Sequence, residues 1–194
     1  MKCVALMSAP LAVVVLLAGC GGPPAQTPVP ADPSSPTATA TPTPTPPVPT
    51  SAACTRDSLS TTYTPTDNSA GHAHGVITFL NISDSTCSLD GYPTVVFDHY
   101  EVAGQLGAVS NNDMTTVPVL VELAPGAAAT AALTIAQAGF VDGCTLVTTN
   151  ALLIAPPLTH PFDWSTDAQN APALGLQACD NDDISLLTVG AVAQ

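Results

Sequence analysis

The chain has 194 residues, and its 15 acidic side chains stand against two basic ones, so the formal charge is −13 at pH 7 with neutral histidines. Lys2 belongs to the apolar start of the chain, which leaves Arg56 as the one base of the remainder. One arginine cannot form the basic surface that nucleic acids or anionic lipids require, so we expect no nucleic-acid partner. The lack of further basic side chains also excludes Schiff-base and phosphoryl chemistry.

Residues 1–19 have the pattern of an export signal. An apolar run from Val4 to Leu17 follows a very short basic start and is too short to span a bilayer as a stable helix. The run ends in Leu17-Ala18-Gly19-Cys20, which resembles a bacterial lipobox. The resemblance implies that the Cys20 thiol is lipidated, that cleavage occurs before it, and that two or three acyl chains anchor the chain to the extracytoplasmic face of the cell membrane. Ordinary secretory cleavage after Ala18 and an uncleaved anchor are the alternatives.

Residues 20–53 are predicted to be a disordered linker. Eleven of the twenty prolines of the chain lie between residues 21 and 53, with Thr, Ala and Ser filling most other positions. Such a composition cannot bury a core and favours extended polyproline II. We interpret the segment as a stalk with a reach of up to roughly 100 Å, and we prefer this spacer role to that of a ligand for proline-binding domains.

Residues 54–194 are predicted to form one folded domain with two disulfides. Four cysteines remain once Cys3 leaves with the signal and Cys20 is modified, and four allow three connectivities that sequence alone does not resolve. We favour the pairs Cys54–Cys87 and Cys144–Cys179, which close loops of similar size. A zinc site is disfavoured because the intervening segments of 32, 56 and 34 residues contain no Cys-x-x-Cys pair.

The local patterns of this domain are those of strands. Short runs rich in Val, Ile, Thr and aromatic residues are bounded by Gly, Pro, Asn or Asp. The expected strands are Leu59–Thr64, Gly75–Ile82, Thr94–Asp98, Thr116–Leu123, Ala128–Ile135, part of Thr145–Ile154, Leu158–Phe162 and Ile184–Val192. No segment has a clear capped helical face, and Leu133–Ala138 is ambiguous. The pattern predicts an all-β fold, an antiparallel β-sandwich of immunoglobulin-like type.

Several motifs of this domain resemble the family called domain of unknown function 4232. They are Gly71-His72, Asn81-x-Ser83, Cys87-x-Leu89-x-Gly91-Tyr92-Pro93, Leu123-Ala-Pro-Gly126, Cys144 and Leu187-Thr-Val-Gly190. The family occurs mainly in actinobacterial exported proteins and lipoproteins. The resemblance implies an extracytoplasmic β-sandwich with the four cysteines in structural disulfides, and it implies no activity.

Two patterns carry possible metal chemistry. His72 and His74 would share one face of a strand and form a half-site for zinc or copper, with His99, His160 or a carboxylate as the third ligand. Residues 180–183 resemble the opening of a calcium loop but lack its later Gly and Glu, so an acidic turn is favoured. We predict no cofactor and no metal site.

Catalytic patterns are weaker still. The chain has no Gly-x-Ser-x-Gly elbow and no His-Glu-x-x-His helix, and we predict no enzymatic activity. Trp164, the one tryptophan, is expected to pack locally rather than to bind sugar or protein. The sequence thus predicts a membrane-anchored envelope lipoprotein that displays a binding or structural module to a protein or glycan partner. A metal-binding protein using His72 and His74 and a secreted hydrolase are the alternatives.

Overall fold

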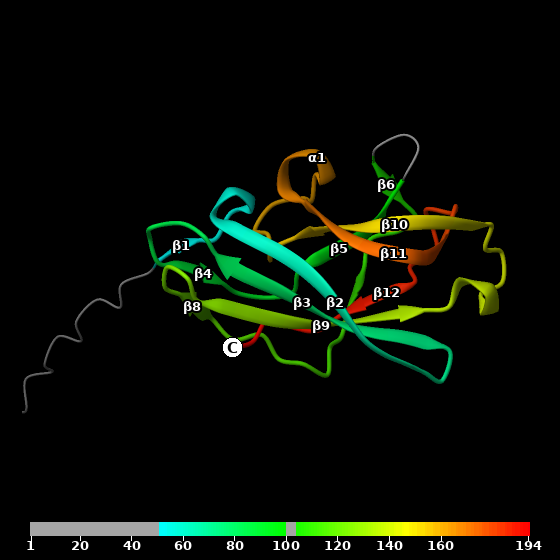
Figure 1. Cartoon of the computed structure of the whole chain (residues 1–194), viewed down its shortest axis with the longest axis horizontal. Coiled ribbons are helices and arrows are strands. Elements are labelled where there is room, and N and C mark those ends of the chain that lie inside the picture. The colour runs from blue at the N-terminus through cyan, green and yellow to red at the C-terminus, as the bar shows by residue number, and fades with distance from the viewer. Residues whose placement is uncertain (1–50, 100–103) are drawn as a thin grey trace, which may run out of the picture. The chain divides into compact units, whose positions relative to one another are not determined.

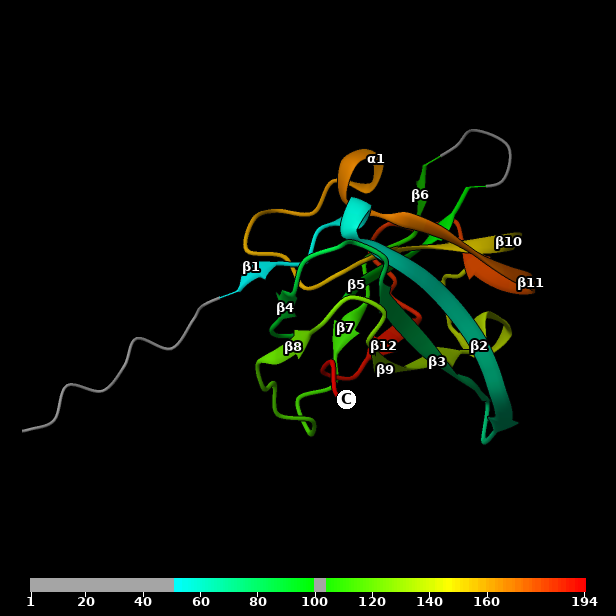
Figure 2. The same cartoon turned by 60° about the vertical axis from the view of Figure 1, so that its left-hand side comes forward.

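The computed structural model describes residues 51–99 and 104–194. The predicted export signal, the lipidation site Cys20 and nearly all of the predicted linker lie outside these residues. Most of the described chain is β-strand (Figures 1 and 2). Its helical elements are the single turn α1 (Trp164–Asp167) and the 3-10 turns η1 (Arg56–Ser58) and η2 (Ala138–Phe140). Within the described ranges, no helix has the length and apolar character needed to cross a membrane.

The strands form three sheets. The five-stranded sheet has the order β2 (Leu59–Ser69), β3 (His72–Asn81), β9 (Ala128–Ala136), β12 (Leu187–Val189) and β7 (Asn111–Asn112). The four-stranded sheet has the order β11 (Gln169–Cys179), β10 (Leu146–Ala155), β5 (Thr94–Asp98) and β6 (Gln105–Leu106). The small sheet consists of β1 (Ala52–Ala53), β4 (Cys87–Leu89) and β8 (Val121–Leu123).

One hydrophobic core holds the sheets together. Alternate residues of β3, such as Ile77 and Phe79, are fully buried, and they share the core with Val95 of β5, Leu152 of β10 and Leu133 of β9. Side chains of alternating position point to opposite faces of a strand, so the core lies between the two large sheets. The predicted all-β sandwich is confirmed.

The sheets are not purely antiparallel. Strand β1 pairs with β4 in parallel, and β12 pairs with β7 in parallel. Both pairings involve two residues of each strand, and the remaining neighbours in the sheets are antiparallel. Such short parallel contacts come from distant segments that return to a sheet edge, which local sequence patterns do not reveal.

One strand prediction is wrong and one strand was not predicted, both near α1. Residues 158–162 form a loop, because prolines before and within this segment remove the donors that a strand needs. The segment instead packs Leu158 and Phe162 on a small second cluster of buried residues. The sequence reading missed the eleven-residue strand β11, which contains Pro172 and Gly175. Pairing with β10 along most of its length overrides the low strand preference of these residues.

Other strands are shorter or longer than expected. The prediction for 116–123 is correct only for Val121–Leu123, and that for 184–192 only for Leu187–Val189. The segment 94–98 matches β5, whereas β2 extends five residues beyond the prediction. Within the ambiguous segment 133–138, residues 133–136 complete β9 and residue 138 begins η2. The pattern of apolar residues therefore predicted where strands occur, while pairing with neighbouring strands determines where each strand begins and ends.

Candidate functional site

The predicted metal half-site, His72 and His74, lies on the outer face of β3, opposite to Ile77 and Phe79. The ring centroids are 6.3 Å apart. Nδ1 of His72 is 3.1 Å from the carbonyl oxygen of Ala70, and Nδ1 of His74 is 3.2 Å from the hydroxyl of Thr134 on β9. Within residues 51–99 and 104–194, no three His, Cys, Asp or Glu side chains gather into a metal-binding group. The pair therefore finds no third ligand in the described chain.

The other residues considered for metal chemistry lie apart. His160 is exposed, with Nδ1 3.0 Å from the carbonyl oxygen of Pro161 and 3.8 Å from Oδ2 of Asp167. His99 follows β5, and its Nδ1 is buried without a partner in the described chain. In the segment 180–183, Asn181 Oδ1 accepts a hydrogen bond from the amide of Asp183, which forms the expected acidic turn.

The described residues contain no hydrogen-bonded Ser–His pair that would support the hydrolase alternative. In the part of the chain that the structure covers, histidine rings bond to Ala70, Thr134 and Pro161, and none bonds to a serine hydroxyl. Trp164 in α1 is 39% exposed, and its ring lies close to Gly104. The packing role expected for Trp164 is compatible with this position.

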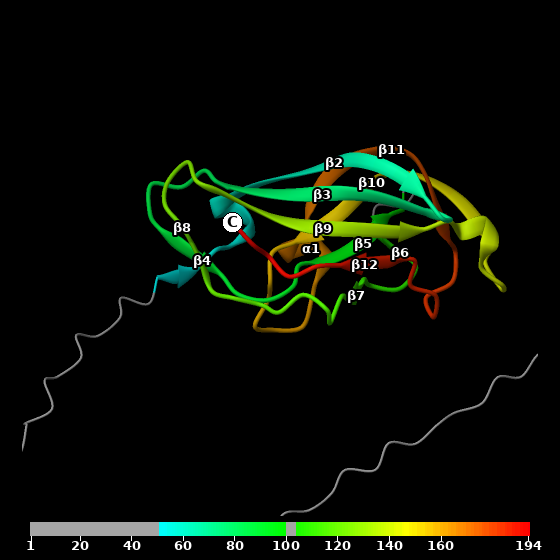
Figure 3. The same cartoon turned by 90° about the horizontal axis from the view of Figure 1, so that it is seen from below.

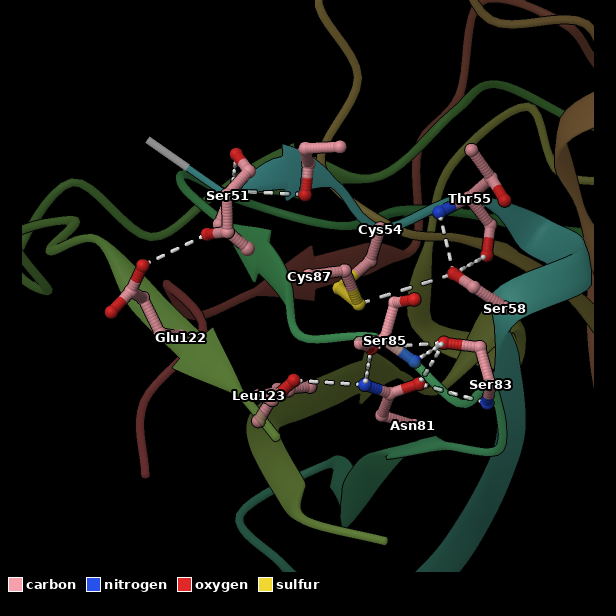
Figure 4. The surroundings of a disulfide bond; sticks show 12 residues. Ser51, Cys54, Thr55, Ser58, Asn81, Ser83, Ser85, Cys87, Glu122 and Leu123 are labelled. Atoms are coloured by element: carbon pink, nitrogen blue, oxygen red, sulfur yellow. Dashed lines mark hydrogen bonds between the residues drawn. A yellow bond between two sulfur atoms is a disulfide. The ribbon is translucent and has the colours of Figure 1, made fainter. Parts of the chain in front are cut away.

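Both favoured disulfides, Cys54–Cys87 and Cys144–Cys179, are confirmed. The Cys54–Cys87 bond joins the start of the domain to β4, beside a hydrogen-bond network centred on Asn81 (Figure 4). The buried Asn81 side chain donates to the carbonyl oxygens of Ser85 and Leu123, at 2.8 Å each, and accepts from the amide and hydroxyl of Ser83. The motif Asn81-x-Ser83 thus ties β3 to β8.

The longer motif that begins at Cys87 also has a structural role. Leu89 is buried, and the Tyr92 hydroxyl donates to the carbonyl oxygen of Thr116. The carbonyl oxygen of Gly91 accepts from the amide of Val192 near the end of the chain. These contacts connect the small sheet to the last residues of the domain and leave none of these groups free for chemistry.

A cleft opens between β2 and β11, the facing edges of the two large sheets. The strands lie side by side (Figures 1 and 3) but belong to different sheets. Near the start of β11, the Gln169 side chain closes the gap by accepting from the amide of Thr61 and donating to the carbonyl oxygen of Leu59. At this point the Gln169 side chain makes the hydrogen bonds that the backbone of a neighbouring strand would otherwise make.

Farther along the same gap, two prolines line the cleft. Pro65 comes from β2 and Pro172 from β11, and both line a hollow of about 540 Å³. Proline lacks the N–H that would donate across an edge, so neither position can donate a hydrogen bond that closes the gap. The sequence thus places a closing Gln169 at one end of the gap and a proline on each side farther along.

The floor of the cleft is continuous with the main core. The Tyr63 ring packs over Gly75, where any Cβ would collide with it, and Tyr63, Ala73 and Leu176 pack on buried core residues. Burial raises the pKa of the Tyr63 hydroxyl above its usual value. Tyr63 therefore stays neutral at physiological pH and presents an apolar ring with one polar atom.

A second hollow of about 410 Å³ extends the cleft toward η2. It shares Asn68, Ala73, Gly175 and Leu176 with the first hollow. Among the residues it adds are Gln137, Gln177 and the 79% exposed Phe140. The two hollows therefore form one groove with an apolar end and an amide-rich end. The Cys144–Cys179 disulfide ties the last residue of β11, two positions after Gln177, to the segment just before β10.

The lining of this groove contains no Asp, Glu, Lys or Arg. That is unusual for a chain with 15 acidic residues, and it separates the groove from a hollow of about 300 Å³ lined by Arg56, Asp57, His160 and Asp167. The sequence reading did not detect the groove, because its residues come from four separate segments. The one local signal of the groove was the presence of Pro172 and Gly175 in an uncharged stretch of the sequence.

Comparison with known proteins adds a family but no activity. Residues 54–193 match the model of the family described as domain of unknown function (DUF4232). None of the curated proteins matches the chain.

Proposed function

The chain belongs to the DUF4232 family, and from this premise we propose that it is a lipid-anchored cell-envelope protein whose sandwich binds a small uncharged ligand in the cleft between β2 and β11. The cleft carries this proposal. Its main hollow of about 540 Å³ has the size of ordinary ligand pockets, and apolar residues with a few polar groups form its lining.

The position of the cleft supports display at a surface. The described chain starts at the end with β1 and β4, and the β2–β3 turn and η2 lie at the other end (Figure 1). A ligand site far from the linker stays accessible when the linker leads to a membrane. The lipobox-like Leu17-Ala18-Gly19-Cys20 and the proline-rich segment supply the proposed anchor and stalk.

Binding can be tested with Nile red, an uncharged dye whose emission shifts to shorter wavelength in apolar surroundings. The full exported chain with Cys20→Ser keeps the stalk and needs no detergent. We expect saturable binding, which Asn68→Trp weakens at least tenfold because the indole fills the part shared by both hollows. Asn111→Trp, at an equally exposed asparagine of β7, is the matched control. Unsaturable binding, or equal loss in both variants, rejects the proposed site.

The anchor is tested separately in cells. Cys20→Ser is expected to abolish acyl labelling and to move the protein from the membrane to the soluble fraction, because the thiol is the group that accepts lipid. Cys3→Ser is the matched control, since this thiol lies in the predicted signal. Unchanged fractionation and labelling of the Cys20 variant contradict the anchor without affecting the cleft.

A further inference from the structure

We infer that the ligand of this groove is a neutral amphiphile with a single apolar chain, an inference that rests on the proposed binding function. The shape of the site motivates it. The two hollows share four lining residues, so they adjoin, and together they are longer than either alone. An extended molecule occupies such a groove better than a compact one does.

The apolar end of the groove suits a hydrocarbon chain. Pro65, Pro172, Ala173 and Leu176 offer aliphatic surface there, and Tyr63 adds an aromatic ring over Gly75. Both prolines lack a donor toward the gap, so an added peptide strand would lose part of its backbone pairing. Burial of apolar surface is then the main contribution to affinity.

The other end suits an uncharged polar head. Asn68, Gln137 and Gln177 are exposed amides that line the second hollow, and their side chains make no hydrogen bond within the described chain. Each amide donates and accepts, which matches hydroxyl and ester groups. No Asp, Glu, Lys or Arg lines the groove to pair with a carboxylate or ammonium group. Its one imidazole, His74, lines only the first hollow, with Nδ1 3.2 Å from the Thr134 hydroxyl.

The acidic surface selects further against an anionic head. The chain carries 15 acids, and Arg56 lines a different hollow beside Asp57 and Asp167. A fatty acid would bring a carboxylate into this negative field without a Lys or Arg in the groove to receive it. A monoacylglycerol of the same chain length has the same apolar part and no charge.

The test is displacement of Nile red from the Cys20→Ser protein. We expect monoacylglycerol to displace the dye at a concentration at least tenfold below that of the fatty acid of equal chain length, and maltose not to displace it. If Nile red does not bind, the proposed function fails. If it binds and the fatty acid competes equally well, or maltose competes, the function stands and the ligand class is wrong.

A charge-introducing variant tests where the head lies. Gln137→Lys supplies a cation at the amide-rich end and is expected to improve displacement by the fatty acid at least fivefold, with little effect on monoacylglycerol. Gln194→Lys makes the same charge change at the exposed chain end and is the matched control. An equal gain in both variants, or no gain with Gln137→Lys, overturns the placement of the head and with it the inferred class.

Discussion

The two ends of the sandwich are built differently. At the end where the described chain begins, buried polar groups are matched by partners, as in the four hydrogen bonds of Asn81 beside the Cys54–Cys87 disulfide. At the other end the sheet edges stay unpaired, and Pro65 and Pro172 line an open groove. Each end thus has a disulfide, but one is closed by hydrogen bonds and the other leaves an open groove.

The family motifs lie mostly at the closed end. Asn81-x-Ser83 and the motif starting at Cys87 make internal contacts there, whereas Gly71-His72 lies at the tip of the β2–β3 turn. A motif can therefore identify the fold without containing the proposed ligand site. Each of the following changes tests one part of this comparison.

The largest effect is expected from the disulfides. Cys54→Ala with Cys87→Ala, and separately Cys144→Ala with Cys179→Ala, should each lower the free energy of unfolding by about 4 kcal/mol, because the loops closed have similar lengths. Urea unfolding measures both. Only the second pair should also weaken Nile red binding, since it fixes the end of β11, which lines the groove. Equal dye affinity in the two double variants would contradict the division between the ends.

The next largest effect is expected from the hydrogen-bond network of Asn81. Asn81→Ala leaves the carbonyl oxygen of Leu123 without its donor in a buried place, and we expect a loss of about 2 to 3 kcal/mol. Asn68→Ala, at the exposed groove, should change stability by less than about 0.5 kcal/mol. Thermal unfolding compares them, and similar losses would show that the closed end is not specially stabilised by its polar contacts.

A stabilising change is expected at Ala70. The β2–β3 turn has two residues of positive φ, Ala70 at 48° and Gly71 at 80°, as a type I′ turn requires. Alanine is strained in this conformation, whereas asparagine adopts it readily, so Ala70→Asn should raise the free energy of unfolding by about 1 kcal/mol. Ala53→Asn, at an exposed residue of the small sheet, is the control. A loss of stability in Ala70→Asn contradicts the turn geometry.

The smallest effect concerns Thr61. Its hydroxyl is buried without a hydrogen-bond partner in the described chain, although its backbone amide donates to Gln169. Thr61→Val removes the unsatisfied hydroxyl at nearly constant shape and should raise the free energy of unfolding by up to about 1 kcal/mol. Thr62→Val on the exposed face is the matched control. Destabilisation by Thr61→Val, measured by urea unfolding, would mean that a water satisfies the hydroxyl.

The strands of high local preference could be predicted and those of low preference could not. The segment 94–98 is rich in Val and Phe and matches β5, because β-branched and aromatic residues pack well on a half-buried sheet. Strand β11 contains Pro172 and Gly175, and only its pairing with β10 makes it a strand. The sequence correctly predicted that His72 and His74 lie on one face of β3. Whether further ligands approach them depends on the tertiary structure.

The amino-acid sequence by itself determined the strand-rich composition, the segregation of prolines before residue 54, the acidic charge and the four cysteines of the folded domain. These properties depend on local preference and count. Tertiary structure alone decided the disulfide pairing, the parallel contacts of β1 and β7, and the groove between β2 and β11, whose lining has no Asp, Glu, Lys or Arg. Each of these joins residues far apart in the chain, so it follows from the packing of two sheets rather than from any local pattern.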